Sequence, residues 1–270
     1  HATTQPAENQ FTGCLLGQCL GDACGFIVEG MPAEHCREYV DTVLTAGDVR
    51  EYQAGPFSFG QYTDDTQLAR EFLQSYVEHG RFDPEDYARR IAGIFKEGRI
   101  VGRGWATEQA AIRLIDGGPW DRAGTPPPAA GNGTAMRAGP VGLVCFDDLE
   151  ALRQTAHDQG RITHQDPRCS AGAAAIAGAV AFAIKGRPFD RHELCEELSM
   201  VVAPFETVFT QALLDLRDWV ELREEEAVEP ISEVGVDPGY DGGWSGISPF
   251  VVGSVLWSLY AFLRTPGDYW

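Results

Sequence analysis

The sequence predicts an all-α protein that folds as a compact single domain. Apolar residues recur at helical spacing along most of the 270 residues, and no run of alternating β-branched residues indicates a strand. No linker divides the chain, and 44% of its residues are hydrophobic, which is enough for one sizeable core. We therefore expect about eight to ten helices and no sheet.

The composition of the chain limits its partners and its compartment. Its formal net charge of −19 argues against nucleic acid and against an anionic membrane surface, because both require clustered Lys and Arg. The longest run of small apolar residues, 171–184, is shorter than the roughly 20 residues of a membrane span. The seven cysteines form neither a zinc pattern nor an even disulfide framework. We expect a soluble, cytoplasmic monomer with buried free thiols.

The first predicted helix, residues 11–25, has a glycine at every fourth position. Each interior glycine costs a helix about 1 kcal/mol relative to alanine, so we expect Gly13 and Gly17 to pack closely against a neighbouring helix. Just after this helix, Glu29 stands alone in the apolar stretch 26–30. Such a carboxylate either has a raised pKa or faces a cation, as general acids and metal ligands do, or it is an ordinary surface residue.

Two adjacent carboxylates, Asp64 and Asp65, lie between two threonines. Their oxygen atoms suit Mg²⁺, Ca²⁺ or Mn²⁺, and without a cation the two charges would repel each other and raise one pKa. The apolar spacing of the next residues predicts a helix over 67–77. Thr63 and Asp64 can equally cap that helix, with Gln67 completing a capping box. The pattern therefore supports both a metal site and a helix cap.

The remaining elements follow in order from apolar spacing and turn residues. Helices are predicted over residues 33–43, 84–95, 107–115, 149–159, 171–184, 192–202, 206–226 and 249–263. The acidic run 224–226 is expected at the solvated end of the helix over 206–226. The Pro-rich stretch 123–130 is predicted as a surface loop or lid, and residues 234–246 as a loop.

Two glycine-containing turns and one histidine complete the candidate residues. The turns at 102–104 and 131–133 expose backbone amides that can meet an anionic ligand, or they merely turn the chain. His164 follows Thr163 at the mouth of the helix over 171–184. A single histidine is more often structural than functional.

Taken together, these motifs resemble those of the ADP-ribosylglycohydrolase family, which includes the dinitrogenase reductase-activating glycohydrolases. The matching motifs are Gly21-Asp22-Ala23-Cys24-Gly25 with Glu29, Tyr62-Thr63-Asp64-Asp65-Thr66, Gly131-Asn132-Gly133-Thr134-Ala135-Met136-Arg137 and Ile162-Thr163-His164. The resemblance covers almost the whole chain and implies an all-α fold. It also implies hydrolysis of the bond between the anomeric C1″ carbon of ADP-ribose and an acceptor, with two Mg²⁺ or Mn²⁺ ions.

The resemblance implies roles for individual residues. Thr63, Asp64 and Asp65 would hold the metal ions, the two aspartates would act in catalysis, and Glu29 would be a metal ligand or the acid/base. The residues expected to contact the substrate are Gly102, Gly104, Asn132, Gly133, Met136, His164 and Trp244. Their expected contacts are with the ribose and the diphosphate, and Trp244 would pack on the substrate.

One departure from the family pattern concerns the second half of the metal site. Family members have an Asp-x-Asp-Thr segment after the last core helix, and this sequence stops at Tyr269-Trp270 before such a segment. Asp237 and Asp241 precede that helix and are poor substitutes by their order in the chain. Either the sequence is a fragment without its C-terminal metal-binding segment, which is the interpretation we favour, or it is a natural truncation. In both cases we expect this chain to bind metal weakly.

The leading hypothesis is a metal-dependent hydrolase that acts on an ADP-ribosylated protein or on a small molecule containing ADP-ribose. The alternative is a non-catalytic ADP-ribose-binding relative. Metal-dependent diphosphate chemistry, a third class, would usually need D-D-x-x-D spacing or more basic residues, and neither is present. The sequence leaves the acceptor open among arginine, serine, a nucleobase, the ADP-ribose polymer and acetylated ADP-ribose.

Overall fold

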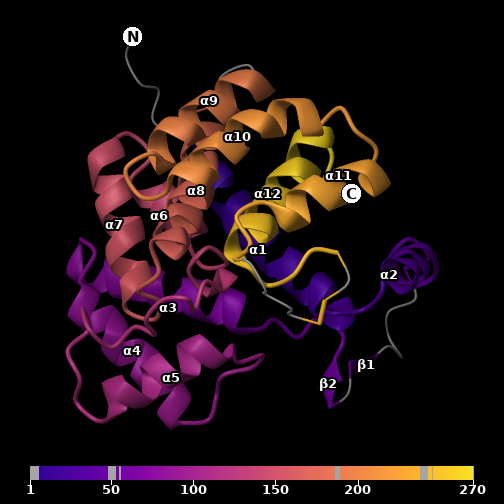
Figure 1. The fold of residues 1–270 in the computed structure, drawn as a ribbon. Helices are drawn as coiled ribbons and strands as arrows, with labels where there is room; N and C mark the ends of the chain where they lie inside the picture. The colour runs from indigo at the N-terminus through magenta and orange to yellow at the C-terminus, as the bar shows by residue number, and fades with distance from the viewer. Residues whose placement is uncertain are drawn as a thin grey trace.

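The structure is a computed structural model that describes residues 6–47, 53–54, 56–185, 189–237, 243–244 and 246–269. Its helices confirm the predicted all-α class (Figure 1). They are α1 (Glu8–Gly25), α2 (Ala33–Tyr39), α3 (Asp64–His79), α4 (Pro84–Lys96), α5 (Trp105–Ile115), α6 (Gly139–Val144), α7 (Leu149–Arg161), α8 (Pro167–Ile184), α9 (Arg191–Val202), α10 (Thr207–Trp219), α11 (Glu224–Glu233) and α12 (Val251–Arg264). Short helical turns are η1 (Phe26–Val28), η2 (Val40–Leu44) and η3 (Asn132–Thr134).

Helix α8 lies at the centre of the bundle, among α6, α7, α9 and α12 (Figure 1). One part of its surface packs into a core with α9, α10 and α12, and another part into a core with α3, α4, α6 and α7. Ala and Gly predominate in α8, so neighbouring backbones approach it closely. A Cβ on Gly142 of α6 would overlap the carbonyl oxygen of Ala177, and a Cβ on Gly178 would lie 2.9 Å from Leu198 Cδ2. The two cores therefore share one narrow helix.

Two short strands correct the expectation that the chain has no sheet. β1 (Gln53–Ala54) pairs antiparallel with β2 (Phe57–Ser58), and Gln53 lies opposite Ser58. This hairpin lies at the edge of the bundle (Figure 1). Strands of two residues are too short to produce a recognisable alternation in the sequence.

The acidic run 224–226 begins a helix instead of ending one, which corrects the single helix predicted over 206–226. Helix α10 ends at Trp219, and α11 starts at Glu224. Glu226 accepts a hydrogen bond from the backbone N–H of Arg223 at 3.3 Å. Three carboxylates in the first turn are favourable because they face the positive end of the helix dipole. Apolar spacing alone does not contain this signal.

The glycines of α1 do not meet a neighbouring helix, contrary to expectation. No described atom lies within 4 Å of a Cβ built on Gly13, and a Cβ on Gly17 would lie 3.6 Å from the Tyr269 ring. Leu16 and Leu20 of the same helix are 58% and 54% exposed. By length and composition the stretch 8–28 and α8 could each cross a membrane, but α8 is mostly buried inside the bundle, as a core helix is.

All seven cysteines are free, but only three of them are buried. These are Cys145, Cys169 and Cys195, whereas Cys14, Cys19, Cys24 and Cys36 are half-buried. Burial raises the pKa of the Cys195 thiol to about 11. The buried thiols are therefore protonated and pack like small apolar side chains.

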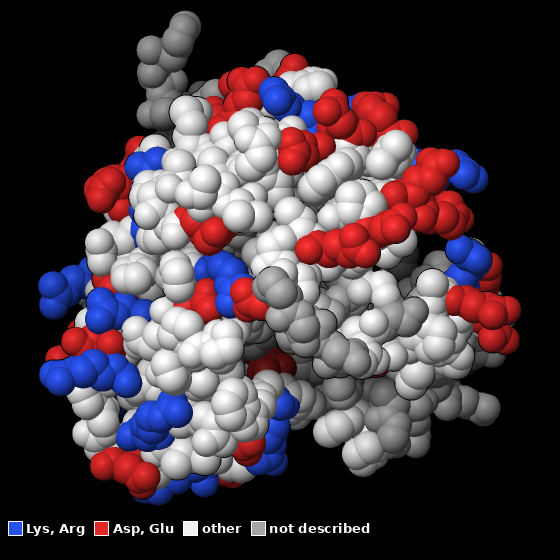
Figure 2. Space-filling view, viewed as in Figure 1, with Lys and Arg blue, Asp and Glu red and all other residues white. Residues whose placement is uncertain are grey.

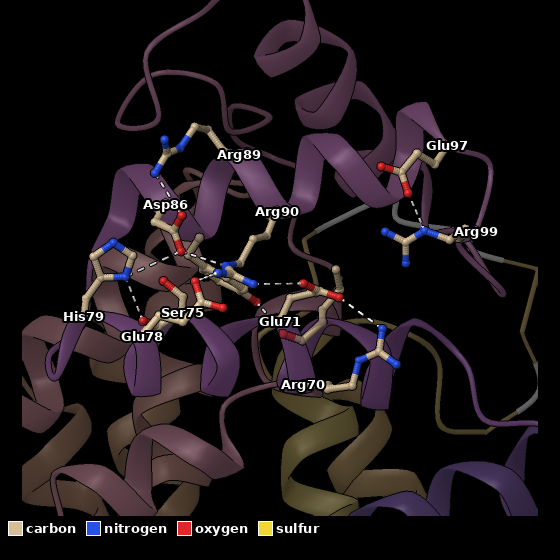
Figure 3. Close-up of polar contacts among 12 residues, drawn as sticks. Arg70, Glu71, Ser75, Glu78, His79, Asp86, Arg89, Arg90, Glu97 and Arg99 are labelled. Carbon is tan, nitrogen blue, oxygen red and sulfur yellow. Dashed lines mark hydrogen bonds and ion pairs between the residues drawn. The ribbon is translucent and has the colours of Figure 1, made fainter.

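Ion pairs between α3 and α4 hold these two helices together (Figure 3). Between the helices, Arg90 of α4 pairs with Glu78 of α3 at 2.5 Å and with Glu71 of α3 at 3.7 Å. Within α4, Asp86 accepts hydrogen bonds from Arg89 at 2.8 Å and from Arg90 at 2.7 Å. Burial raises the pKa of Asp86, but the hydrogen bond from Arg90, its charge and the other contacts of this carboxylate together outweigh burial and hold that pKa below its usual value. Figure 2 shows Lys and Arg interspersed with Asp and Glu in this part of the visible face.

Alanine at Gly142 tests the close packing of α6 on α8. The added methyl group would overlap the backbone of α8, so we expect Gly142→Ala to lower the free energy of unfolding by about 1–3 kcal/mol in urea denaturation. Gly93→Ala in α4 is the matched control, because a Cβ there meets no described atom within 4 Å. This control should match the wild type or exceed its stability by up to about 1 kcal/mol. Equal losses in both variants would contradict the packing argument.

Candidate active site

A cavity of about 800 Å³ brings together parts of the chain that are distant in sequence. Its lining comes from the end of α1 with η1, the start of α3, residues 102–107, residues 128–136, His164, and the residues before α12. A cavity of this size suits a nucleotide-sized ligand. The site is therefore built by tertiary contacts between short motifs.

Asp22, at the end of α1, fixes the acidic wall of this cavity. Its carboxylate accepts hydrogen bonds from Thr63 N at 2.8 Å, from Thr63 Oγ1 at 2.7 Å and from Thr66 N at 3.1 Å. The Thr63 side chain makes no cap bond to its own helix. Asp22 thus caps α3 from another helix, which corrects the cap predicted from Thr63 and Asp64.

Gln67 binds the loop before α5 instead of completing a capping box. Its Nε2 donates to the Arg99 carbonyl at 2.9 Å, and its Oε1 accepts from Val101 N at 2.9 Å. The Asp64 N–H donates to the Val101 carbonyl at 2.7 Å. These bonds bring Gly102 beside the acids, where a Cβ would lie 3.1 Å from Asp64 Oδ1 and φ is +69°. Both the space and the backbone conformation favour glycine there.

The carboxylates of the acidic wall repel one another. Burial and then the charge of Asp65 raise the pKa of Asp64 to about 8, and burial and then the charge of Asp22 raise the pKa of Asp65 to about 7. The pKa of Glu29, at the cavity rim, is also raised, by burial and by Asp22. Arg103 lines the same cavity, but it pairs at 3.0 Å with an acid outside it. The cluster therefore has negative charge that is poorly balanced by its neighbours.

The donor chemistry of this cluster suits a hard divalent cation. Mg²⁺ and Mn²⁺ prefer carboxylate and hydroxyl oxygens, and a dication would remove the repulsion that raises these pKa values. Thr66 Oγ1 is also buried and has no hydrogen-bond partner among the described residues. In the described part of the chain, no three His, Cys, Asp or Glu side chains form a metal-binding group. Thr63, Asp64 and Asp65 thus offer the type of ligand atom that the cation prefers, but they supply only part of its coordination shell.

A second wall of the cavity is formed by η3 and the residues around it. Asn132 Nδ2 donates to Ser254 Oγ of α12 at 3.0 Å, so the asparagine side chain is held by the last helix. A Cβ on Gly133 would lie 2.9 Å from His164 Cε1, and glycine therefore lets the imidazole approach this turn. His164 is 2% exposed and lines the cavity.

Two residues that the sequence did not single out hold the walls in place. Gln18 Nε2 of α1 donates to the Met136 carbonyl at 3.1 Å and to the Asp65 carbonyl at 3.3 Å, so it connects both walls. Thr125, in the Pro-rich stretch, forms a bridge to His164 through backbone hydrogen bonds of 2.8–2.9 Å. The middle of this stretch, 126–128, is exposed, as predicted for a surface loop, but its two ends are buried.

Trp244, predicted to pack on the substrate, does not line the cavity, and Asp237 lines it without joining the acidic cluster. Trp244 is absent from the cavity lining among the described residues and lies 3.4 Å from a Cβ built on Gly30. Asp237 lines the cavity but pairs with Arg168 at 2.9 Å. Asp241 lies outside the described residues.

All other residues predicted for the site line the same cavity. They are Glu29, Thr63, Asp64, Asp65, Gly102, Gly104, Asn132, Gly133, Met136 and His164. Sequence reasoning missed Asp22 as a site residue, although its place in the Gly21-Asp22 motif was a usable signal. It also missed Gln18, for which the sequence contains no signal because its role depends on contacts with distant backbone.

Comparison with known proteins places the chain in a family. A sequence model of ADP-ribosylglycohydrolase matches residues 3–270. An uncharacterized protein of Archaeoglobus fulgidus is 31% identical over 227 residues, which are 83% of this chain and 71% of that protein. ADP-ribosylhydrolase ARH3 of Bos taurus is 28% identical over 288 residues, which cover 95% of this chain and 73% of that protein.

A solved structure of an ADP-ribosylglycohydrolase-related protein complex has the same fold. The TM-score is 0.68 at 24% identity, over 96% of this chain and 77% of that chain. At this identity the likeness concerns the fold alone. Because the family model matches almost every residue, the protein belongs to the ADP-ribosylglycohydrolase family.

Proposed function

We propose that this protein is a metal-dependent hydrolase that cleaves the glycosidic bond between ADP-ribose and an acceptor, and so reverses ADP-ribosylation. The family supports hydrolysis of ADP-ribose linkages in general. The observation that supports the finer proposal is the acidic wall formed by Asp22, Glu29, Asp64 and Asp65, which lines the same cavity as η3 and His164.

In this proposal the two walls have different tasks. Thr63, Asp64 and Asp65 would hold Mg²⁺ or Mn²⁺, which would supply Lewis-acid charge and a more acidic bound water. Asn132, Gly133 and His164 would bind the ribose and the diphosphate, and Glu29 at the rim would transfer a proton or bind the metal. The raised pKa of Glu29 brings it closer to neutral pH, where a general acid/base is most effective.

A non-catalytic ADP-ribose-binding protein is the second candidate function. It is favoured by one observation, that the described residues offer no complete metal-binding group. Both candidates require the same cavity, and they differ only in turnover. Activity measurements therefore decide between them.

The test of the proposal is binding and hydrolysis by the full-length protein. Calorimetry with ADP-ribose should detect binding, and release of ADP-ribose should be measurable from at least one linkage to arginine, serine, a nucleobase, the polymer or acetate. Hydrolysis should stop when a chelator removes the metal and return when Mg²⁺ or Mn²⁺ is added. Binding without hydrolysis of any substrate would support the second candidate, and the absence of binding would refute both.

Asparagine at Asp64 or Asp65 should weaken metal binding and activity together. Each change removes a charge that would balance the dication, so we expect turnover to fall by more than the roughly 100-fold limit typical of residues around the ligands. The rise in Tm caused by Mn²⁺ should also shrink. Without metal, neither variant should be less stable than the wild type, because a repelling charge is gone. Asp116→Asn, at the exposed end of α5, is the control and should change neither quantity.

Glutamine at Glu29 should separate proton transfer from metal binding. Glu29→Gln keeps the shape but cannot exchange a proton, so turnover should fall by about 10²–10⁴-fold while ADP-ribose affinity stays within a few-fold. A parallel loss of affinity, with rescue by excess Mn²⁺, would instead make Glu29 a metal ligand. Near-normal turnover, like that expected for Glu34→Gln on the exposed part of α2, would exclude both roles.

A further inference from the structure

A line of hydrogen bonds leads from the protein interior to the cavity through His164. Arg137 Nη2 donates to Thr163 Oγ1 at 2.8 Å, and Thr163 Oγ1 lies 2.9 Å from His164 Nδ1. All three residues are buried, with at most 2% of their surface exposed. A Cβ on Gly131, which lines the cavity, would lie 3.7 Å from His164 Nε2. Nδ1 is therefore held from behind, and Nε2 lies on the cavity side.

The single hydroxyl proton of Thr163 decides which nitrogen of His164 carries the ring proton. Thr163 Oγ1 must accept from Arg137, because a guanidinium only donates. The hydroxyl proton can then go to His164 Nδ1 at 2.9 Å or to the Gly160 carbonyl at 3.4 Å. That carbonyl already accepts the backbone N–H groups of Thr163 and His164, both at 3.0 Å, and has two lone pairs. The hydroxyl therefore donates to Nδ1.

The charge of Arg137 reinforces this arrangement. Its Nε donates to Gln159 Oε1 and its Nη2 to the Gln159 carbonyl, both at 2.8 Å, and its guanidinium lies 5.8 Å from the Tyr87 ring centre. None of these partners is a carboxylate, so the positive charge is not neutralised by them. A donor that is cationic polarises the Thr163 hydroxyl and strengthens the hydrogen bond that this hydroxyl donates.

His164 is also kept neutral by its surroundings. Burial and then the charge of Arg137 lower the pKa of His164 to about 3, although Asp166 acts in the opposite direction. Asp166 itself caps α8 and pairs with Arg168 at 2.8 Å, and this pairing limits the effect of its charge on the pKa of His164. A ring that stays neutral has one N–H, and the hydrogen bond from Thr163 leaves that N–H at Nε2.

We propose that Thr163 and Arg137 are positioning residues that hold His164 as the neutral Nε2–H tautomer, so that His164 offers the cavity a hydrogen-bond donor. Such a donor binds an acceptor oxygen, of the diphosphate or of a ribose hydroxyl, and does not act as a base. The identity of this acceptor rests on the proposed function. The tautomer itself does not, because it follows from contacts within the protein.

Nitrogen-15 NMR of protein labelled at histidine tests the tautomer directly. We expect the His164 ring of the ligand-free protein at neutral pH to show a protonated Nε2 and an unprotonated Nδ1 whose signal is shifted by an accepted hydrogen bond. Loss of these signals in His164→Gln assigns them. A protonated Nδ1 in the wild type, alone or together with Nε2, would overturn the proposal regardless of how any variant folds.

Substitution of Thr163 tests the source of the effect. Thr163→Val removes the hydroxyl and keeps the shape, so the Nδ1 signal should move to the position of a nitrogen without a hydrogen bond, whereas Thr163→Ser should restore it. Thr155→Val removes the hydroxyl of another buried threonine, in α7, and should leave the His164 signals unchanged. An unchanged Nδ1 signal in folded Thr163→Val would refute the role of Thr163.

Titration with ADP-ribose tests the role of the donor. Binding should shift the Nε2 signal more than the Nδ1 signal, and Thr163→Val should bind ADP-ribose about tenfold more weakly in calorimetry. Binding that leaves Nε2 unchanged would overturn the donor role. If ADP-ribose does not bind at all, the proposed function fails, while the tautomer is still decided by the spectra of the ligand-free protein.

Discussion

The close approach of neighbouring helices to α8 is the constraint on which the site depends. Gly142 of α6 meets the α8 backbone directly, and a Cβ on Gly172 of α8 would overlap Val251 at the start of α12. Both neighbours extend to the cavity, because η3 leads into α6 and Ser254 of α12 holds Asn132. His164 lies just before the start of α8 itself. A narrow central helix therefore determines where one wall of the cavity stands.

The other wall depends on electrostatics more than on packing. Asp22 is stabilising because its carboxylate satisfies backbone N–H groups at the start of α3, where the helix dipole also favours negative charge. The same carboxylate raises the pKa of Asp65 and of Glu29. One residue thus stabilises the fold and increases the repulsion within the site. The cation in the proposed function would relieve this repulsion.

The two walls complement each other in the proposed function. The acidic wall would hold the metal ions, whereas the wall around His164 would offer a hydrogen-bond donor to an oxygen of ADP-ribose. Arg137 contributes from the interior, since its buried charge acts on the wall around His164 through the Thr163 hydroxyl. In the proposed function, substrate binding and metal chemistry would thereby be separated within one cavity.

The sequence by itself determined the all-α class and most helices, and it singled out a set of site residues of which all but Trp244 line the cavity, because apolar spacing and short motifs are local properties of the chain. It did not reveal that Asp22 caps α3, that Gln67 holds the loop at Gly102, or that Gln18 joins the two walls, since each of these bonds joins groups distant in the chain. Nor could it reveal which ring nitrogen of His164 carries the proton, because that depends on the Thr163 hydroxyl and on the buried charge of Arg137. Only the tertiary structure decided these features, because hydrogen bonding and electrostatic repulsion depend on distances that folding alone establishes.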